Sequence, residues 1–236
     1  MTETESSDRG LSSYLDPVLT LAQTMHATSS AYAILLGAGV SIAAGVPSAW
    51  GVVENLSSRL AAQEHQDAGD DPAGWFCTRY GHDPRYEELL ESLAPTQLER
   101  QRILAQFFEP SPGSVDGEPS RGQPSLAHRS VARLAAAGHL RVILTLNFDR
   151  LTETALREIG IEPTVVASVE DLAGLAPLHT LQALVVHLHG DYLSATTMLN
   201  TTTELGTYPA TVNQFLDQVL TDYGLLIVGW SGAYDE

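Results

Sequence analysis

Lysine is absent from this chain, and cysteine occurs only once. All twelve basic residues are arginine. The absence of lysine excludes a P-loop lysine, Schiff-base chemistry and a lysine general base. The single cysteine, Cys77, permits no disulfide within the chain. It also cannot form a zinc ribbon that needs four thiolates, so several common kinds of enzyme and metal module are ruled out.

Positive charge and long apolar runs are also scarce. The formal net charge of −17 repels nucleic acid and anionic membranes, so we expect this domain to bind neither directly. No run approaches the roughly 20 apolar residues that cross a bilayer. The amino-terminal segment MTETESSDRG is polar and acidic, unlike a signal peptide. We therefore expect a cytoplasmic protein.

What is present is an alternation of apolar strands and amphipathic helices. The helix expected from Ser125 to Gly138 should turn Leu126, Val131, Leu134 and Ala135 inward. Other helices are expected at 14–27, 52–62, 151–159 and 211–220, and strands at 33–36, 141–146, 163–167, 183–188 and 225–230. This order predicts an α/β fold with a doubly wound, mostly parallel, Rossmann-like sheet.

Residues 63–124 interrupt that alternation. Apolar spacing predicts short helices at 86–93 and 97–108, and 109–124 is rich in Pro, Gly and Ser, as in an exposed loop. We interpret 63–124 as a helical insertion in one domain spanning 1–236. The last strand is apolar and no helix follows to cover it, so we also expect a further C-terminal domain beyond this chain.

The first strand ends in a glycine-rich loop. Gly37 and Gly39 would let the backbone turn sharply and approach a ligand, and backbone N–H groups there could hold a pyrophosphate. A plain tight turn would need the same glycines. A dinucleotide fingerprint for hydride transfer requires a third glycine where this chain has Ile42. The acidic residue it also requires is missing, because Glu54 falls within a helical pattern, so an oxidoreductase is disfavoured.

Polar side chains follow two further strands. Thr145, Asn147 and Asp149 lie where open α/β sheets bind ligands, although either Asn147 or Asp149 could simply cap the next helix. In HLHGD, the period of two sends His187, His189 and Asp191 toward the same side if the strand stays extended. A buried histidine can be a core residue. His187, His189 and Asp191 could instead be the metal ligands of a metal-dependent hydrolase.

Four segments together resemble the signature blocks of the sirtuin superfamily, whose members cleave the nicotinamide glycosidic bond of NAD. They are GAGVSIAAGVP at 37–47, TLNFD at 145–149, HLHG at 187–190 and VGWS at 228–231. Protein deacylases of that superfamily carry a four-cysteine zinc ribbon, which this chain cannot make. They also have a Phe-Arg pair where this chain has Ser48–Trp50, and glutamine where it has Leu146. These departures resemble the bacterial sirtuin-like NAD hydrolases of antiphage defence.

The resemblance implies a site and a mechanism. NAD would be the substrate, no metal would be required, and the partner would be a second copy of the chain or a sensor domain or protein. Asn147 would orient water or the nicotinamide carboxamide, His189 would act as base, and Asp149 would hold Asn147 or the ribose. The implied NAD-binding residues are Gly37, Ala38, Gly39, Ser41, Gly45, Pro47, Thr145, Gly229 and Ser231. An inactive NAD-binding module for sensing or oligomerisation remains an alternative, and protein deacylation is a weaker one.

Overall fold

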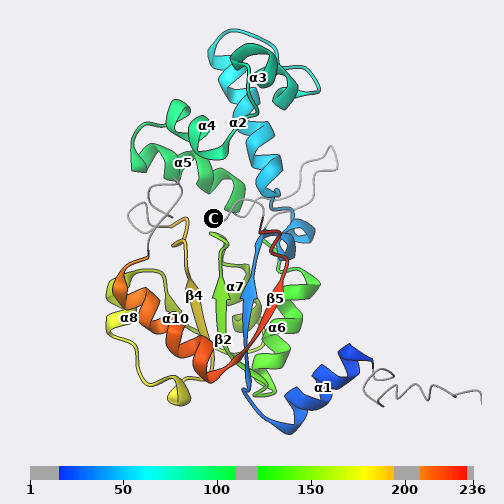
Figure 1. Ribbon diagram of the computed structural model, residues 1–236, viewed down its shortest axis with the longest axis vertical. Coiled ribbons are helices and arrows are strands. Elements are labelled where there is room, and N and C mark those ends of the chain that lie inside the picture. Colours follow the sequence, from blue (N-terminus) through cyan, green and yellow to red (C-terminus); the bar gives the residue numbers. More distant parts are fainter. Residues whose placement is uncertain (1–15, 110–121, 194–207, 233–236) are drawn as a thin grey trace, which may run out of the picture.

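The fold is built on one sheet of five parallel strands (Figure 1). The structure, a computed structural model, describes residues 16–109, 122–193 and 208–232. The strands lie in the order β3-β4-β2-β1-β5. Their bounds are β1 Tyr32–Leu36, β2 Leu140–Thr145, β3 Thr164–Val166, β4 Leu184–His187 and β5 Gly224–Val228. The predicted α/β, Rossmann-like class is confirmed, and each expected strand is present.

Strand register brings four strand ends to one edge of the sheet. Leu36 at the end of β1 is paired with Thr145 of β2 and with Val228 of β5. Thr145 is paired in turn with His187 at the end of β4. Because all the strands are parallel, the loops that leave them emerge side by side.

Helices cover both faces of the sheet. On one face lie α1 Pro17–Ala27, α6 Leu126–Ala136 and α7 Leu151–Glu158, and on the other lie α8 Val169–Ala173 and α10 Ala210–Asp222. The alternation of side chains along β2 explains this division: Ile143 joins the first core, while Val142 and Leu144 join the second. Both faces are apolar, as a buried parallel sheet requires.

A third layer of helices stands over the carboxyl ends of the strands (Figure 1). It comprises α2 Ala49–Gln63, α3 Pro72–Tyr80, α4 Tyr86–Leu93 and α5 Gln97–Phe108. The bounds predicted for α4 and α5 are confirmed. Helix α2 begins earlier than expected because the Ser48 hydroxyl accepts the Gly51 N–H at 3.1 Å and caps it. Most of the predicted 109–124 loop, from 110 to 121, lies outside the described residues.

Helix α6 corrects one detail of the predicted core. Leu126 is 75% exposed, whereas His128 is 1% exposed and lies on the face that also carries Val131 and Ala135. Leu126 is the first residue of the helix, and the buried face of the helix begins only at His128. The helices of the described residues include none that is long and apolar enough to span a bilayer.

Candidate functional site

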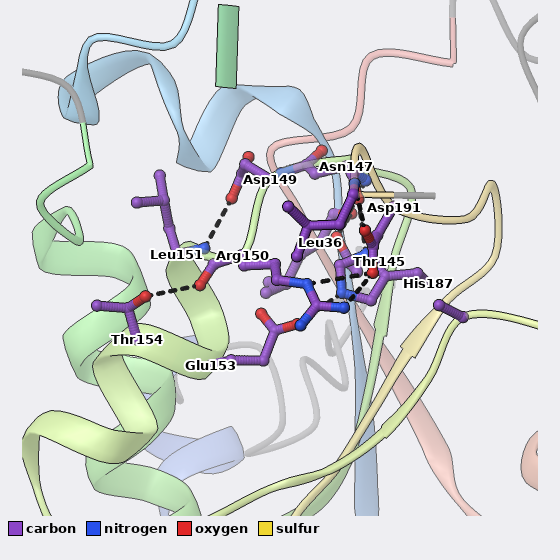
Figure 2. A network of polar contacts seen from close by, with 12 residues as sticks. Leu36, Thr145, Asn147, Asp149, Arg150, Leu151, Glu153, Thr154, His187 and Asp191 are labelled. Atoms are coloured by element: carbon purple, nitrogen blue, oxygen red, sulfur yellow. Dashed lines mark hydrogen bonds and ion pairs between the residues drawn. The ribbon is translucent and has the colours of Figure 1, made fainter. Parts of the chain in front are cut away.

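The candidate site lies where three loops meet at the carboxyl edge of the sheet. The glycine-rich loop follows β1 and contains two short 3₁₀ helices, η2 Ala38–Val40 and η3 Ile42–Ala44. The second loop joins β2 to α7, and the third is the turn after β4. Figure 2 shows the polar contacts that connect the last two.

Close packing explains the glycines of the first loop. A Cβ on Gly37 would lie 2.6 Å from Trp230 Cα, and one on Gly39 would lie 2.9 Å from the Gly229 carbonyl oxygen. Gly229 itself has a φ of +72°. These glycines therefore let the loops after β1 and β5 touch, whether or not a ligand is bound.

Most backbone N–H groups of this loop are already used inside the protein. Gly37 and Gly39 donate to the carbonyls of Val228 and Gly229, at 3.0 and 2.8 Å. The N–H groups of Val40 and Ser41 donate within the loop. Ala38 is exposed, and within the described residues its N–H has no hydrogen bond. Of the GAG triplet, Ala38 is thus the residue whose N–H can meet a phosphate without a rearrangement.

Ser41 is the junction of the polar network. It is fully buried, and its hydroxyl donates to Asp149 Oδ2 at 2.7 Å. The same oxygen accepts from Asn147 Nδ2 at 3.1 Å and lies 3.4 Å from His128 Nε2. A hydroxyl has one hydrogen to donate, so Ser41 cannot also donate to a phosphate while it holds Asp149.

His128 supports Ser41 from the interior. The Ser125 backbone N–H donates to His128 Nδ1 at 3.1 Å, so this nitrogen is an acceptor and Nε2 carries the hydrogen that faces Ser41. Burial lowers the pKa of His128, although the charges of Asp149 and Glu153 oppose that shift. His128 is therefore a neutral donor.

Asn147 is held on several sides. Its N–H donates to Thr145 Oγ1 at 3.0 Å, and its carboxamide nitrogen donates to the Gly37 carbonyl at 3.2 Å as well as to Ser41. Asp149 Oδ1 accepts the Leu151 N–H at 3.1 Å, at the start of α7. Asp149 therefore accepts the first N–H of this helix and, through Ser41, also supports Asn147.

His187 forms a buried pair with Glu153. His187 Nε2 lies 2.7 Å from Glu153 Oε1, and Nδ1 lies 3.0 Å from the Asn147 carbonyl oxygen. Burial alone would lower the pKa of His187, but the hydrogen bond to Glu153 and its charge outweigh burial and raise that pKa. Both ring nitrogens face oxygen atoms, and the raised pKa favours the imidazolium form of the ring.

His189 occupies the turn after β4 and is 8% exposed. Its ring is stacked on Tyr208 with centroids 6.4 Å apart, and the Phe148 ring lies 6.5 Å away on centroids. Gly190, with a φ of +77°, donates a hydrogen bond from its N–H to the His187 carbonyl oxygen at 3.2 Å. The turn therefore places His189 beside the loop that carries Asn147.

The structure removes the geometric argument for a metal site formed by His187, His189 and Asp191. The strand ends at His187, so the extended alternation that would align His187, His189 and Asp191 does not continue. Both His187 nitrogens are engaged, and Asp191 forms an ion pair with Arg150. Within residues 16–109, 122–193 and 208–232, no group of three His, Cys, Asp or Glu side chains is arranged to hold a metal ion.

The remaining predicted residues frame the same edge. Gly45 has a φ of +80° and ends η3, and Pro47 follows it half-buried. Thr145 is buried and supports Asn147 through its hydroxyl. Ser231 is exposed after β5, next to the loop that touches Gly37.

Three residues at this site were not singled out by sequence: His128, Glu153 and Arg150. A signal existed for His128, since helical spacing puts it on the buried face of α6 with Val131 and Ala135. No local pattern marks Glu153 or Arg150, because their partners are His187 and Asp191, more than thirty residues away.

Comparison with known proteins adds one finding to this geometry. The family model of the SIR2-like domain matches residues 141–235. A search of curated proteins finds no match. The matched region begins in β2 and contains Asn147, Asp149, His189 and Ser231, while the glycine-rich loop lies before it. The match supports a place in the sirtuin-like superfamily and an NAD-related function.

Proposed function

We propose that the protein is an NAD glycohydrolase, which converts NAD and water to ADP-ribose and nicotinamide. The observation that carries the proposal is the Ser41-centred network: it ties Asn147 and Asp149 to the glycine-rich loop, beside the turn that bears His189. The SIR2-like match supports the same reading. A bound NAD would then be the substrate of the site.

NAD would lie across the carboxyl ends of β1, β2, β4 and β5. The exposed Ala38 N–H would donate to the pyrophosphate, and Ser231 would contribute near the adenosine half. Gly37, Gly39 and Gly229 would shape this wall by letting the loops after β1 and β5 approach each other. Ser41 would act from behind it as a positioning residue.

Cleavage of the glycosidic bond passes through an oxocarbenium-like ribose, so the site must stabilise developing positive charge. His189 would accept a proton from a ribose hydroxyl or from the attacking water, a contribution of roughly 10²- to 10⁴-fold for a general base. Asn147 would orient that water or the departing carboxamide. Its carboxamide oxygen is suited to this because its nitrogen is already held by Gly37 and Ser41.

Asp149 would be a positioning residue. It is 4% exposed, and its two oxygens accept from Ser41 and Leu151. It would hold Asn147 through the shared Ser41 hydroxyl. Loss of Asp149 would therefore act on the rate of cleavage more than on NAD affinity.

The biological role we propose is depletion of NAD by an effector of bacterial antiphage defence, controlled by a sensor or by self-association. The departures from the deacylase pattern at Ser48–Trp50 and Leu146, together with the single cysteine, support hydrolysis over deacylation.

Product analysis tests the proposal. Purified protein, with its activating partner where one is required, should turn NAD into equal amounts of nicotinamide and ADP-ribose without any acyl peptide. Nicotinamide release that depends on an acylated peptide would instead support deacylation, and NAD binding without any release would support a binding module.

A further inference from the structure

The His187–Glu153 pair lies beneath the candidate site and reaches both of its catalytic loops. His187 is the last residue of β4, and Glu153 is in the first turn of α7. Both side chains are fully buried. In Figure 2 the two residues lie below Asn147. Because both side chains are fully buried, neither can contact a substrate, and any contribution to catalysis must act through other residues.

Through its ring and its backbone, His187 fixes the two loops at once. Its Nδ1 donates to the Asn147 carbonyl at 3.0 Å, and its own carbonyl accepts the Gly190 N–H at 3.2 Å, in the turn that carries His189. The Asn147 peptide is thereby held at its carbonyl as well as at its N–H. His187 thus connects the positions of Asn147 and His189.

Glu153 holds the His187 ring in this orientation. Its Oε1 is 2.7 Å from His187 Nε2, while Oε2 is buried without a hydrogen-bond partner among the described residues. Among the described residues, His187 is therefore the hydrogen-bond partner that holds the Glu153 carboxyl group. A buried ion pair is commonly no more stabilising than apolar side chains of similar volume. Stability alone does not explain why a charged pair occupies this place.

We propose that the His187–Glu153 pair is a positioning device that holds Asn147 and the His189 turn in the arrangement needed to cleave the glycosidic bond. The inference rests on the proposed function. Removal of one partner would strand a buried charge, so the informative change removes both.

The test compares His187→Leu/Glu153→Leu with the wild-type protein in NAD binding and nicotinamide release. The double variant should fold cooperatively and bind NAD within about threefold of wild type, because both side chains are fully buried and would not contact a bound NAD. Its kcat should fall on the order of 10²-fold, the loss expected when catalytic groups shift by about 1 Å. Hydrogen exchange of the amides at 147–151 should become faster.

Two further variants complete the design. Glu153→Gln keeps a hydrogen bond to Nε2 and lets a neutral His187 still donate to Asn147, so its kcat should stay within about tenfold of wild type. Arg129→Leu/Glu158→Leu removes an exposed pair that joins α6 to the other end of α7, and it should leave the rate unchanged.

A folded His187→Leu/Glu153→Leu protein with the wild-type kcat and wild-type amide exchange would overturn the inference. Should the double variant not fold, Glu153→Gln decides: a folded protein with its hydrogen bonds intact but a loss on the order of 10²-fold in kcat would contradict positioning through those bonds. Failure of wild type to release nicotinamide would refute the proposed function instead, and amide exchange would still test the positioning claim.

Discussion

Two of the buried serines in this protein differ in the hydrogen bonds of their hydroxyl groups, and this difference leads to a prediction. Ser41 and Ser57 are both fully buried. The Ser41 hydroxyl bonds Asp149 and Asn147, whereas the Ser57 hydroxyl has no partner within the described residues. Ser41→Ala should lower the free energy of unfolding by about 1–3 kcal/mol, because it strands buried polar partners.

Ser57→Ala is the matched control, and its free energy of unfolding should change by less than about 0.5 kcal/mol or increase, since no bond is lost. Urea unfolding of both variants measures the contrast. Equal losses from the two substitutions would show that the Ser41 network does not stabilise the fold.

Two of the buried histidines, His187 and His128, should affect stability in opposite directions as pH changes. The pKa of His187 is raised in the fold, because Glu153 and the Asn147 carbonyl outweigh the effect of burial. Its contribution is therefore fully present below the unfolded pKa of about 6.5 and is lost as pH rises through the folded pKa. The pKa of His128 is lowered by burial, so its contribution is present above about 6.5 and is lost as pH falls.

Urea unfolding between pH 5 and 9 (about 2 units either side of neutrality) checks these signs with His187→Gln and His128→Gln. The stability advantage of wild type over His187→Gln should shrink toward alkaline pH. Its advantage over His128→Gln should shrink toward acid pH, each by up to about 1.4 kcal/mol per pH unit. A pH-independent difference for His187→Gln would contradict the charged His187–Glu153 pair.

At the scale of the elements, the contact between the loops after β1 and β5 makes Gly37 sensitive to a single methyl group. Its φ of −108° suits alanine, so a Cβ is opposed by close packing alone, at 2.6 Å from Trp230 Cα and 2.7 Å from the Gly229 carbonyl oxygen. Gly37→Ala should destabilise the protein by about 1–3 kcal/mol through overpacking. Gly174→Ala is the control, because its φ is −92° and the nearest atom is 3.8 Å away.

Gly174→Ala should be neutral or should stabilise by about 0.4–1 kcal/mol, through reduced freedom of the unfolded chain. Thermal and urea unfolding measure both variants. A Gly37→Ala protein as stable as wild type would mean that the two loops do not pack as closely as 2.6 Å implies.

The elements were largely predictable, whereas the site's supporting contacts were not. Periodicity and caps located all five strands and the bounds of α4 and α5, because those signals are local. Helix α3 was not identified by itself, although Asp71 and Pro72 provide a cap and first turn. The roles of Glu153 and His128 depend on partners distant in sequence, and the turn at Gly190 ended the alternation that had aligned His187, His189 and Asp191.

At the scale of the whole molecule, the acidic charge and the proposed anionic substrate oppose each other. The net charge of −17 repels NAD at long range, and the SIR2-like match covers only residues 141–235. Raising the salt concentration should screen this repulsion and tighten NAD binding by about two- to fivefold. Binding of neutral adenosine should change less. NAD affinity that falls with salt would instead indicate attraction by local arginines.

The proposed cleavage of NAD is measured by nicotinamide release from saturating NAD, with the wild-type protein compared with Asn147→Ala and His189→Ala. Wild type should release nicotinamide when its activating partner is present. Each variant should lose roughly 10²- to 10⁴-fold in kcat while it still binds NAD. Equal release by wild type and both variants, or NAD binding with no release by wild type, would contradict NAD cleavage by Asn147 and His189.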